Sequence, residues 1–196
     1  MFRKDFGNVI VDFGPLLIVL AIFALIFLIQ LIRAIISELK TINIQKKIVV
    51  GDYKAIIKTG EKLLRSYQKS NSKFPSKSLI SRIEYLNSYL AISYFSQSDD
   101  ENFLKHINSL NENSYLKEFW LSLYYLRKND IDNFQLHYDN ISVNDETLRG
   151  RIYLESIKLY MQGDYDTAKS KISETYEHMN HVILKQIADE VLKSKN

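Results

Sequence analysis

Four polar residues near the C-terminus are the closest approach to a metal centre in the sequence. Glu174, Glu177, His178 and His181 stand three or four positions apart, so one helix could place them on a single face. Carboxylate and imidazole groups are common Zn²⁺ ligands. No second ligand pair stands elsewhere, however, and His181 falls at an expected break between helices. We therefore interpret these four residues as surface side chains and predict no metal.

Motifs for enzyme chemistry are absent from the sequence. It contains no P-loop, no H-E-x-x-H motif, no G-x-S-x-G motif and no cysteine. The lack of cysteine also excludes disulfide bonds and a cysteine-linked lipid anchor. The sequence therefore predicts no catalytic residue, no cofactor and no small-molecule substrate.

One element near the N-terminus is far more apolar than the rest. Residues 16–36 are an apolar run in which only Gln30 and Arg33 are polar, and as a helix they span about 30 Å, the thickness of a bilayer's hydrocarbon layer. The run is too long for a cleavable signal peptide, and Arg33, Ile35 and Glu38 occupy the region where small residues would be needed. The sequence predicts a single transmembrane helix at 15–36, in the cell membrane.

The segment before this helix has two interpretations. Phe2, Phe6, Ile10 and Phe13 recur at helical spacing within the tail, residues 1–14, and such a segment could lie in the membrane interface. A loosely ordered apolar tail is the alternative.

Charge predicts the orientation of the chain. Arg3 and Lys4 precede the span beside Asp5 and Asp12. Six bases follow it: Arg33, Lys40, Lys46, Lys47, Lys54 and Lys58. Because Lys and Arg are retained on the cytoplasmic side, the C-terminal domain is expected in the cytoplasm.

The same six bases are candidates for contact with anionic lipid. Residues 33–82 carry a net charge of +9 and residues 83–146 carry −7, so the basic half adjoins the membrane. An ordinary solvated basic face is the alternative. Nucleic-acid binding is not predicted, because the basic region lacks interleaved aromatic residues and any base-reading motif.

Internal repeats organise the remaining chain. G-D-Y-K-A begins at Gly51 and G-D-Y-D-T-A begins at Gly163, with weaker copies at Ser98-Asp99 and Asn129-Asp130. The intervals between these turns are 47, 31 and 34 residues. A period near 34 residues is typical of helix-turn-helix repeats. The longest interval contains a polar segment with Pro75, residues 69–78, which we interpret as a loop.

The positions around these turns resemble tetratricopeptide (TPR) repeats. Small residues before the turn are Ala91, Ser122 and Ser156, and large ones are Tyr94, Tyr125 and Leu159. Asp follows each turn at 52, 99, 130 and 164, and Ile56, Phe103, Phe134 and Ala168 come four residues later. The first unit departs from the pattern at Ile44 and Lys47, so its leading helix is expected to continue the membrane helix.

The resemblance implies an all-α, TPR-like solenoid over 51–196 that follows a helical stalk at 37–50. Expected helices are 52–68, 79–97, 100–109, 114–128, 131–140, 146–162 and 165–178, with a capping helix at 181–194 whose apolar residues form one stripe. A plain antiparallel helical bundle is the alternative fold.

In TPR folds the first helix of each pair lines a concave groove. The corresponding positions are Ile92, Phe95, Phe119, Leu123, Leu126, Tyr153, Ile157 and Tyr160. Exposed apolar residues in this arrangement would bind a protein or peptide partner, unless the capping helix or the loop fills the groove.

The resemblance therefore implies a membrane-anchored interaction scaffold or adaptor. The alternative is a non-catalytic accessory subunit of a membrane enzyme or transporter, with the span packing in the bilayer. Ala21 and Ala24 are only a weak version of the small-residue motif that such packing uses.

Overall fold

A computed structural model describes residues 3–6, 9–12, 14–112, 114–145, 147–179 and 181–194. The chain divides into two compact units, Met1–Asn43 and Ile44–Asn196, and the second is called the helical unit below. Apart from one two-stranded sheet in the first unit, the regular structure in the described residues is helical.

The described part of the N-terminal tail is a β-hairpin. Strand β1, Arg3–Phe6, pairs antiparallel with β2, Val9–Asp12, and the register places Arg3 opposite Asp12. The helical spacing of Phe6 and Ile10 was therefore misleading, because the run Val9-Ile10-Val11 is β-branched and favours a strand. Phe2 and Phe13 lie outside the described residues.

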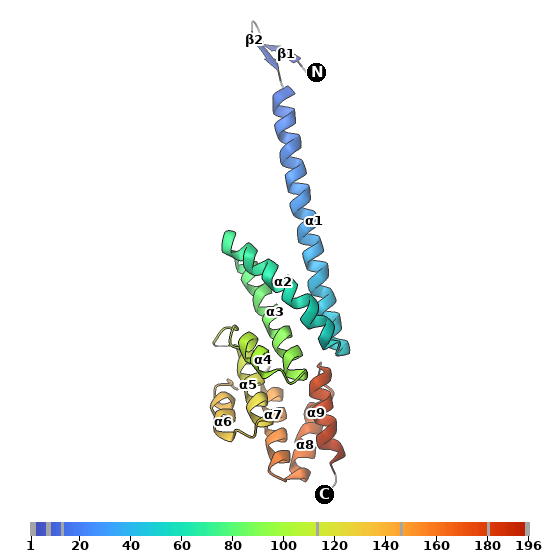
Figure 1. Ribbon diagram of the computed structural model, residues 1–196, viewed down its shortest axis with the longest axis vertical. Coiled ribbons are helices and arrows are strands. Elements are labelled where there is room, and N and C mark those ends of the chain that lie inside the picture. The colour runs from blue at the N-terminus through green and yellow to red at the C-terminus, as the bar shows by residue number, and fades with distance from the viewer. Residues whose placement is uncertain are drawn as a thin grey trace. The chain divides into compact units, whose positions relative to one another are not determined.

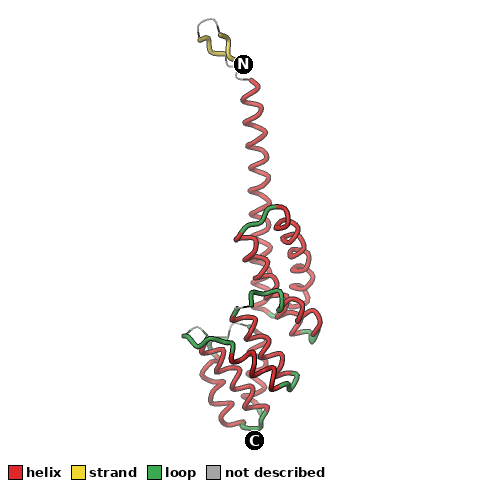
Figure 2. Tube along the Cα trace, turned by 90° about the vertical axis from the view of Figure 1, so that its left-hand side faces the viewer, coloured by secondary structure: helices red, strands yellow, loops and turns green. Residues whose placement is uncertain are grey.

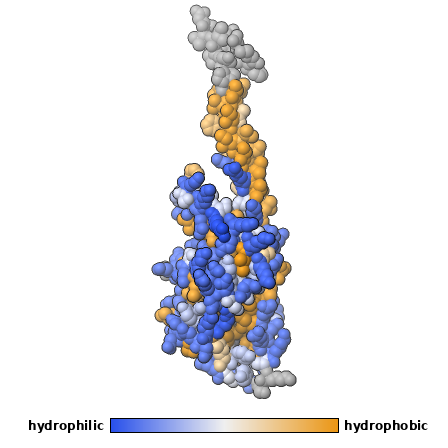
Figure 3. Space-filling model, viewed as in Figure 1, coloured by the Kyte–Doolittle hydropathy of each residue, from blue (hydrophilic) through white to orange (hydrophobic). Residues whose placement is uncertain are grey.

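The predicted span and stalk form one continuous helix. Helix α1, Gly14–Val50, has 37 residues, with Pro15 in its first turn, where its missing N–H has no intrahelical acceptor. Every side chain from Leu16 to Ile36 is exposed, and the helix is long and apolar enough to cross a membrane. Its hydrophobic surface is the orange column in Figure 3.

The last residues of α1 belong to the helical unit. Ile44 and Ile48 are 2% and 4% exposed, so this end of α1 contributes to the core although its sequence departs from the repeat pattern.

Within the described residues, eight helices follow α1, joined by short connections (Figures 1 and 2). Their bounds are α2 Tyr53–Lys73, α3 Lys77–Ser96, α4 Asp100–Ile107, α5 Tyr115–Arg127, α6 Ile131–Asp139, α7 Leu148–Met161, α8 Tyr165–Tyr176 and α9 Val182–Lys193. Packing is closest between neighbours in sequence, namely α2 with α3, α3 with α4, α5 with α6 and α7 with α8. The helical unit is therefore a succession of hairpins followed by α9.

The four predicted turns share one local design. Gly51, Ser98, Asn129 and Gly163 all have positive φ, between 56° and 86°. The next residue is an aspartate each time, and its carboxylate accepts a hydrogen bond from the backbone N–H three residues later, at 3.1 to 3.3 Å. The left-handed residue reverses the chain and the aspartate caps the next helix. Asp52, Asp99, Asp130 and Asp164, which follow the turns in the sequence, are thus the N-cap residues of α2, α4, α6 and α8.

The predicted loop at 69–78 is much shorter than expected. Helix α2 continues to Lys73, and only residues 74–76 separate it from α3. Ser70 Oγ donates to the Ser66 carbonyl at 3.0 Å, so polar residues that suggested a loop are accommodated on the exposed face of a helix. The helix ends before Pro75, which restricts the preceding residue to extended backbone.

Small residues allow the helices to approach closely. Ala91, Ser122, Ser156 and Ala168 are all 0% exposed. Both serines satisfy their hydroxyls locally, because Ser122 Oγ donates to the Glu118 carbonyl at 2.8 Å and Ser156 Oγ donates to the Ile152 carbonyl at 2.7 Å. Neither serine therefore leaves a buried hydroxyl without a hydrogen bond.

Replacing Ala168 with aspartate should unfold the helical unit. The new carboxylate would be fully buried in α8 without a partner, so we expect the free energy of unfolding to fall by roughly 3 kcal/mol or more. Urea unfolding in detergent, followed by fluorescence of the single tryptophan, Trp120, measures the change. Ser173→Asp, at an exposed position of the same helix, is the matched control. Equal midpoints for the two variants would contradict the packing described.

Candidate partner groove

The eight residues predicted to line a groove lie on three successive helices. Ile92 and Phe95 are on α3, three more are on α5 and the last three are on α7. Seven of the eight are between 0% and 6% exposed, and Tyr160 is partly buried. This set of residues is called the inner face below. In the structure it is therefore covered, not an open surface, because another segment of the same chain lies against it.

Aromatic contacts join the inner face across the helices. The Phe119 and Tyr153 ring centroids are 6.1 Å apart, which links α5 to α7. Trp120 meets Phe95 edge-on at 5.4 Å and Phe119 at 5.6 Å, so it links α5 to α3. Edge-to-face pairs of this kind add to the stabilisation from burial. Trp120 belongs to this cluster although its spacing did not place it on the inner face.

Helix α9 is the segment that covers the inner face. Tyr153 Oη donates to the Leu184 carbonyl at 3.2 Å, and the His181 ring meets Trp120 edge-on at 6.1 Å. The Ile183 N–H donates to Tyr53 Oη at 3.1 Å, a contact between residues 130 apart in sequence. In Figure 1, α9 lies beside α7 and α8. In this structure the C-terminal helix therefore packs against the residues that were predicted to line a groove.

Two cavities remain where α9 meets the inner face. One, of about 290 Å³, is lined by the rings of Tyr115, Phe119, Trp120 and Tyr153, and by His181 and Leu184 beside α9. The other, of about 300 Å³, is lined by Phe95, Leu123 and Ile157 opposite Ile183, Ile187 and Val191 of α9. The fit of α9 on the inner face is therefore incomplete along its length.

His181 is one of the polar residues that line the first cavity, with Arg149, Thr175 and His178. It precedes α9 as its N-cap residue but makes no side-chain capping bond. Its Nδ1 atom is buried and has no hydrogen-bond partner among the described residues. Burial lowers the pKa of this imidazole, which favours the neutral ring. An occupant of the cavity would find one unused hydrogen-bonding atom within aromatic walls.

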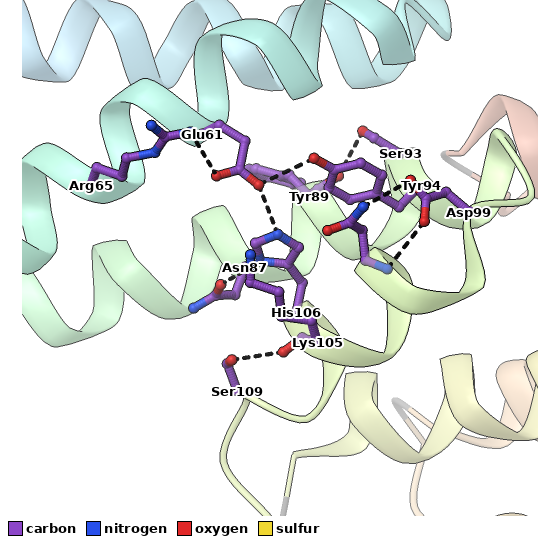
Figure 4. A network of polar contacts seen from close by, with 11 residues as sticks. Glu61, Arg65, Asn87, Tyr89, Ser93, Tyr94, Asp99, Lys105, His106 and Ser109 are labelled. Atoms are coloured by element: carbon purple, nitrogen blue, oxygen red, sulfur yellow. Dashed lines mark hydrogen bonds and ion pairs between the residues drawn. The ribbon is translucent and has the colours of Figure 1, made fainter.

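A buried polar network fastens the first two hairpins, and Figure 4 shows its arrangement. His106 is 2% exposed, and its Nε2 lies 3.0 Å from Glu61 Oε1 while its Nδ1 lies 2.9 Å from Asn87 Oδ1. Tyr94 Oη donates to the same Glu61 oxygen at 3.2 Å, and the Tyr94 ring stacks on His106 at 5.4 Å. Both imidazole nitrogens are occupied, so the network is structural and has no free nitrogen for a substrate.

The next hairpin contains a second copy of this arrangement. His137 Nδ1 lies 2.8 Å from Glu118 Oε2, and the His137 ring stacks on Tyr125 at 5.3 Å. The signal for both copies is present in the sequence as Y-x4-D-x2-N-F-x2-H, beginning at Tyr94 and at Tyr125. The repeat pattern includes the Tyr, Asp and Phe positions of this motif but not its histidine, so the stacked tyrosine and histidine pairs were not predicted.

The predicted basic residues are mostly solvent-exposed. Arg33, Lys40, Lys46, Lys54 and Lys58 are exposed and Lys47 is partly buried. Among the described side chains, no three His, Asp or Glu residues are grouped so as to hold a metal ion. Glu174, Glu177 and His178 are exposed on or just after α8, and both His178 and the partly buried His181 line the first cavity described above.

No protein-family model, curated protein or solved structure matches this chain. The likeness to TPR repeats thus stays a prediction from the sequence, and any function must be argued from the residues themselves.

Stability should fall in mild acid because of His106. Burial lowers the pKa of His106 below its usual 6.5, although the Glu61 carboxylate opposes this shift. The unfolded chain therefore binds more protons than the folded one, so stability is complete above about pH 6.5 and is lost as the pH falls through the folded-state pKa. The buried His181 acts in the same direction.

Urea unfolding at about pH 7.5 and about pH 5 measures this loss. His106→Gln should lose less stability over that interval than the parent chain, whereas the exposed His178→Gln should behave as the parent does. An identical pH dependence in all three proteins would refute the assignment.

Proposed function

We propose that this chain is a single-pass membrane protein whose helical unit is a TPR-like protein-protein interaction module. Helix α1 would be the anchor, because its side chains from Leu16 to Ile36 are apolar apart from Gln30 and Arg33 and are all exposed, which is unfavourable in water and favourable in lipid. The four capped turns and the hairpins between them support the TPR-like assignment.

The observation that carries the proposal is the seating of α9 on the inner face. A short amphipathic helix there buries its apolar side while Gln186 and Glu190 stay exposed. Recognition of an amphipathic helix in an apolar groove is a recurrent mode of protein binding. We infer that the natural partner presents such a helix, and that it binds the inner face in exchange with α9.

The incomplete fit of α9 favours exchange. The two cavities beside it leave apolar atoms of the inner face without neighbours, and each missing contact forfeits dispersion energy. A partner helix with larger side chains at these points would gain those contacts. The partner helix must also compete with α9, which is part of the same chain and therefore has an effective concentration in the millimolar range. Exchange therefore selects partners that fill the cavities.

The side of the membrane follows from the basic residues. Arg33, Lys40, Lys46, Lys47, Lys54 and Lys58 succeed the apolar run, and the positive-inside rule then assigns the helical unit to the cytoplasm. The module would thus present its groove to cytoplasmic proteins.

Locking α9 in place should abolish binding in trans. A Cβ atom built at Gly51 would lie 3.5 Å from Val182 Cβ, within the range for a disulfide. The full-length chain with Gly51→Cys and Val182→Cys should bind a fluorescent peptide of residues 181–194 when reduced. When oxidised, it should bind at least about tenfold more weakly, because the tethered helix can no longer leave. Fluorescence anisotropy in detergent measures both states.

Gly51→Cys alone is the matched control for this lock. It carries the same strain, since Gly51 has a φ of +74° and a left-handed residue with a side chain costs about 1–2 kcal/mol. Its peptide binding should be insensitive to redox state. Equal binding by the oxidised and reduced double variant would contradict helix exchange. The accessory-subunit alternative predicts a different result. A native partner would then be captured equally by the oxidised and the reduced double variant, and its capture would be lost when α1 is replaced by an unrelated transmembrane helix.

A reporter fused to the C-terminus tests the orientation. Alkaline phosphatase needs disulfides that form outside the cytoplasm, so we expect this fusion to be inactive and a green fluorescent protein fusion to be bright. Replacing the six bases with glutamate should raise phosphatase activity. High activity in the unaltered fusion would place the groove outside the cell.

A further inference from the structure

The turn between α2 and α3 carries the most exposed large apolar side chain in the described part of the chain. Phe74 is 80% exposed, more than any apolar side chain of the apolar α1 helix. Its backbone is nevertheless ordered, because the Phe74 N–H donates to the Ser70 carbonyl at 2.9 Å and Ser76 Oγ accepts from the Leu79 N–H at 3.2 Å. The turn therefore holds an aromatic ring in solvent on a short, well-defined connection.

The segment of the chain that contains Phe74 is positively charged. Residues 62–83 contain no acidic residue, whereas the central part of the chain is acidic. Lys69, Lys73 and Lys77 stand close to Phe74 along the chain, and all three are exposed. These four residues are called the hairpin tip below. An aromatic side chain flanked by lysines is suited to the surface of an anionic bilayer. The ring can enter the boundary below the headgroups, while the lysine ammonium groups stay among the lipid phosphates.

We propose that the hairpin tip is a second membrane contact, which inserts Phe74 into the interface of an anionic bilayer. The inference rests on the proposed anchoring by α1. It adds a surface that is separate from the six basic residues between Arg33 and Lys58. With both contacts made, the helical unit is held against the bilayer at two points instead of swinging on one helix.

The lengths of the helices support this contact. The stalk, residues 37–50, extends about 21 Å from the end of the predicted span, and α2, with 21 residues, extends about 32 Å from the turn at Gly51. The length of α2 therefore exceeds the length of the stalk. A protein partner would not require three lysines around one ring, whereas lipid headgroups supply negative charge at every point of the surface.

Site-specific labelling of the full-length chain in nanodiscs tests the proposal, because the chain has no native cysteine. Phe74→Cys would carry the environment-sensitive dye NBD in discs of phosphatidylcholine with or without phosphatidylglycerol. In anionic discs we expect a blue-shifted emission, roughly twofold more intense, that lipids with a spin label near the headgroup quench. Val143→Cys, at a position 69% exposed in the acidic part of the chain, is the control and should emit as in water in both discs.

Two further variants separate the possible outcomes. Changing Lys69, Lys73 and Lys77 to glutamate in the Phe74→Cys chain should abolish the blue shift and the quenching. Phe27→Cys reports on α1 and should be buried in lipid in both discs. If the dye at position 74 matches that at position 143 while position 27 is buried, the hairpin tip proposal is wrong and the anchor stands. If position 27 is also in water, the anchor fails and the tip proposal fails with it.

Discussion

The contact between α9 and the inner face is the interaction on which the rest of the helical unit depends. Packing is closest between helices that are neighbours in sequence, so the apolar residues of the inner face, on α3, α5 and α7, need cover from another segment. Helix α9 supplies that cover and, through the hydrogen bond between Ile183 and Tyr53, joins the last helix to the first part of the unit. Helix α9 thus packs on the inner face and also contacts Tyr53 of α2.

In the proposed exchange, a groove that already holds α9 would behave differently from an open one. The affinity for a partner would then be the difference between two helix affinities, so specificity would come from residues of the inner face that α9 fails to satisfy. The unpaired Nδ1 of His181 and the aromatic rings around the first cavity are such features. They are located where a longer or bulkier helix would make contacts that α9 does not.

The polar contacts within the hairpins divide the unit into different environments. The α3–α4 and α5–α6 hairpins each contain a stacked tyrosine and histidine pair, with Glu61 of α2 or Glu118 of α5 as the acidic partner. In the last hairpin, Lys171 Nζ lies 3.1 Å from Glu155 Oε2, and no histidine takes part in that pair. The buried imidazole of His106 therefore ties a pH response to α4, whereas the last hairpin uses a partly exposed ion pair that is worth little energy.

Local signals in the sequence were sufficient for the helices and their turns. The apolar run at 16–36 demands a helix of bilayer length, and an aspartate after each left-handed residue begins a helix whatever its surroundings, because these effects act within a few residues. Local pattern failed where two local structures compete, as in the tail, where β-branched residues formed strands, and at 69–73, where polar residues extended α2.

Contacts between residues far apart in the sequence could not be predicted from local pattern. The spacing of Phe95, Leu123 and Tyr153 placed them on one side of their helices, but only the folded chain decided that α9 would cover them. The burial of that face depends on how the hairpins pack on one another, and that packing is determined by many side-chain contacts across the unit.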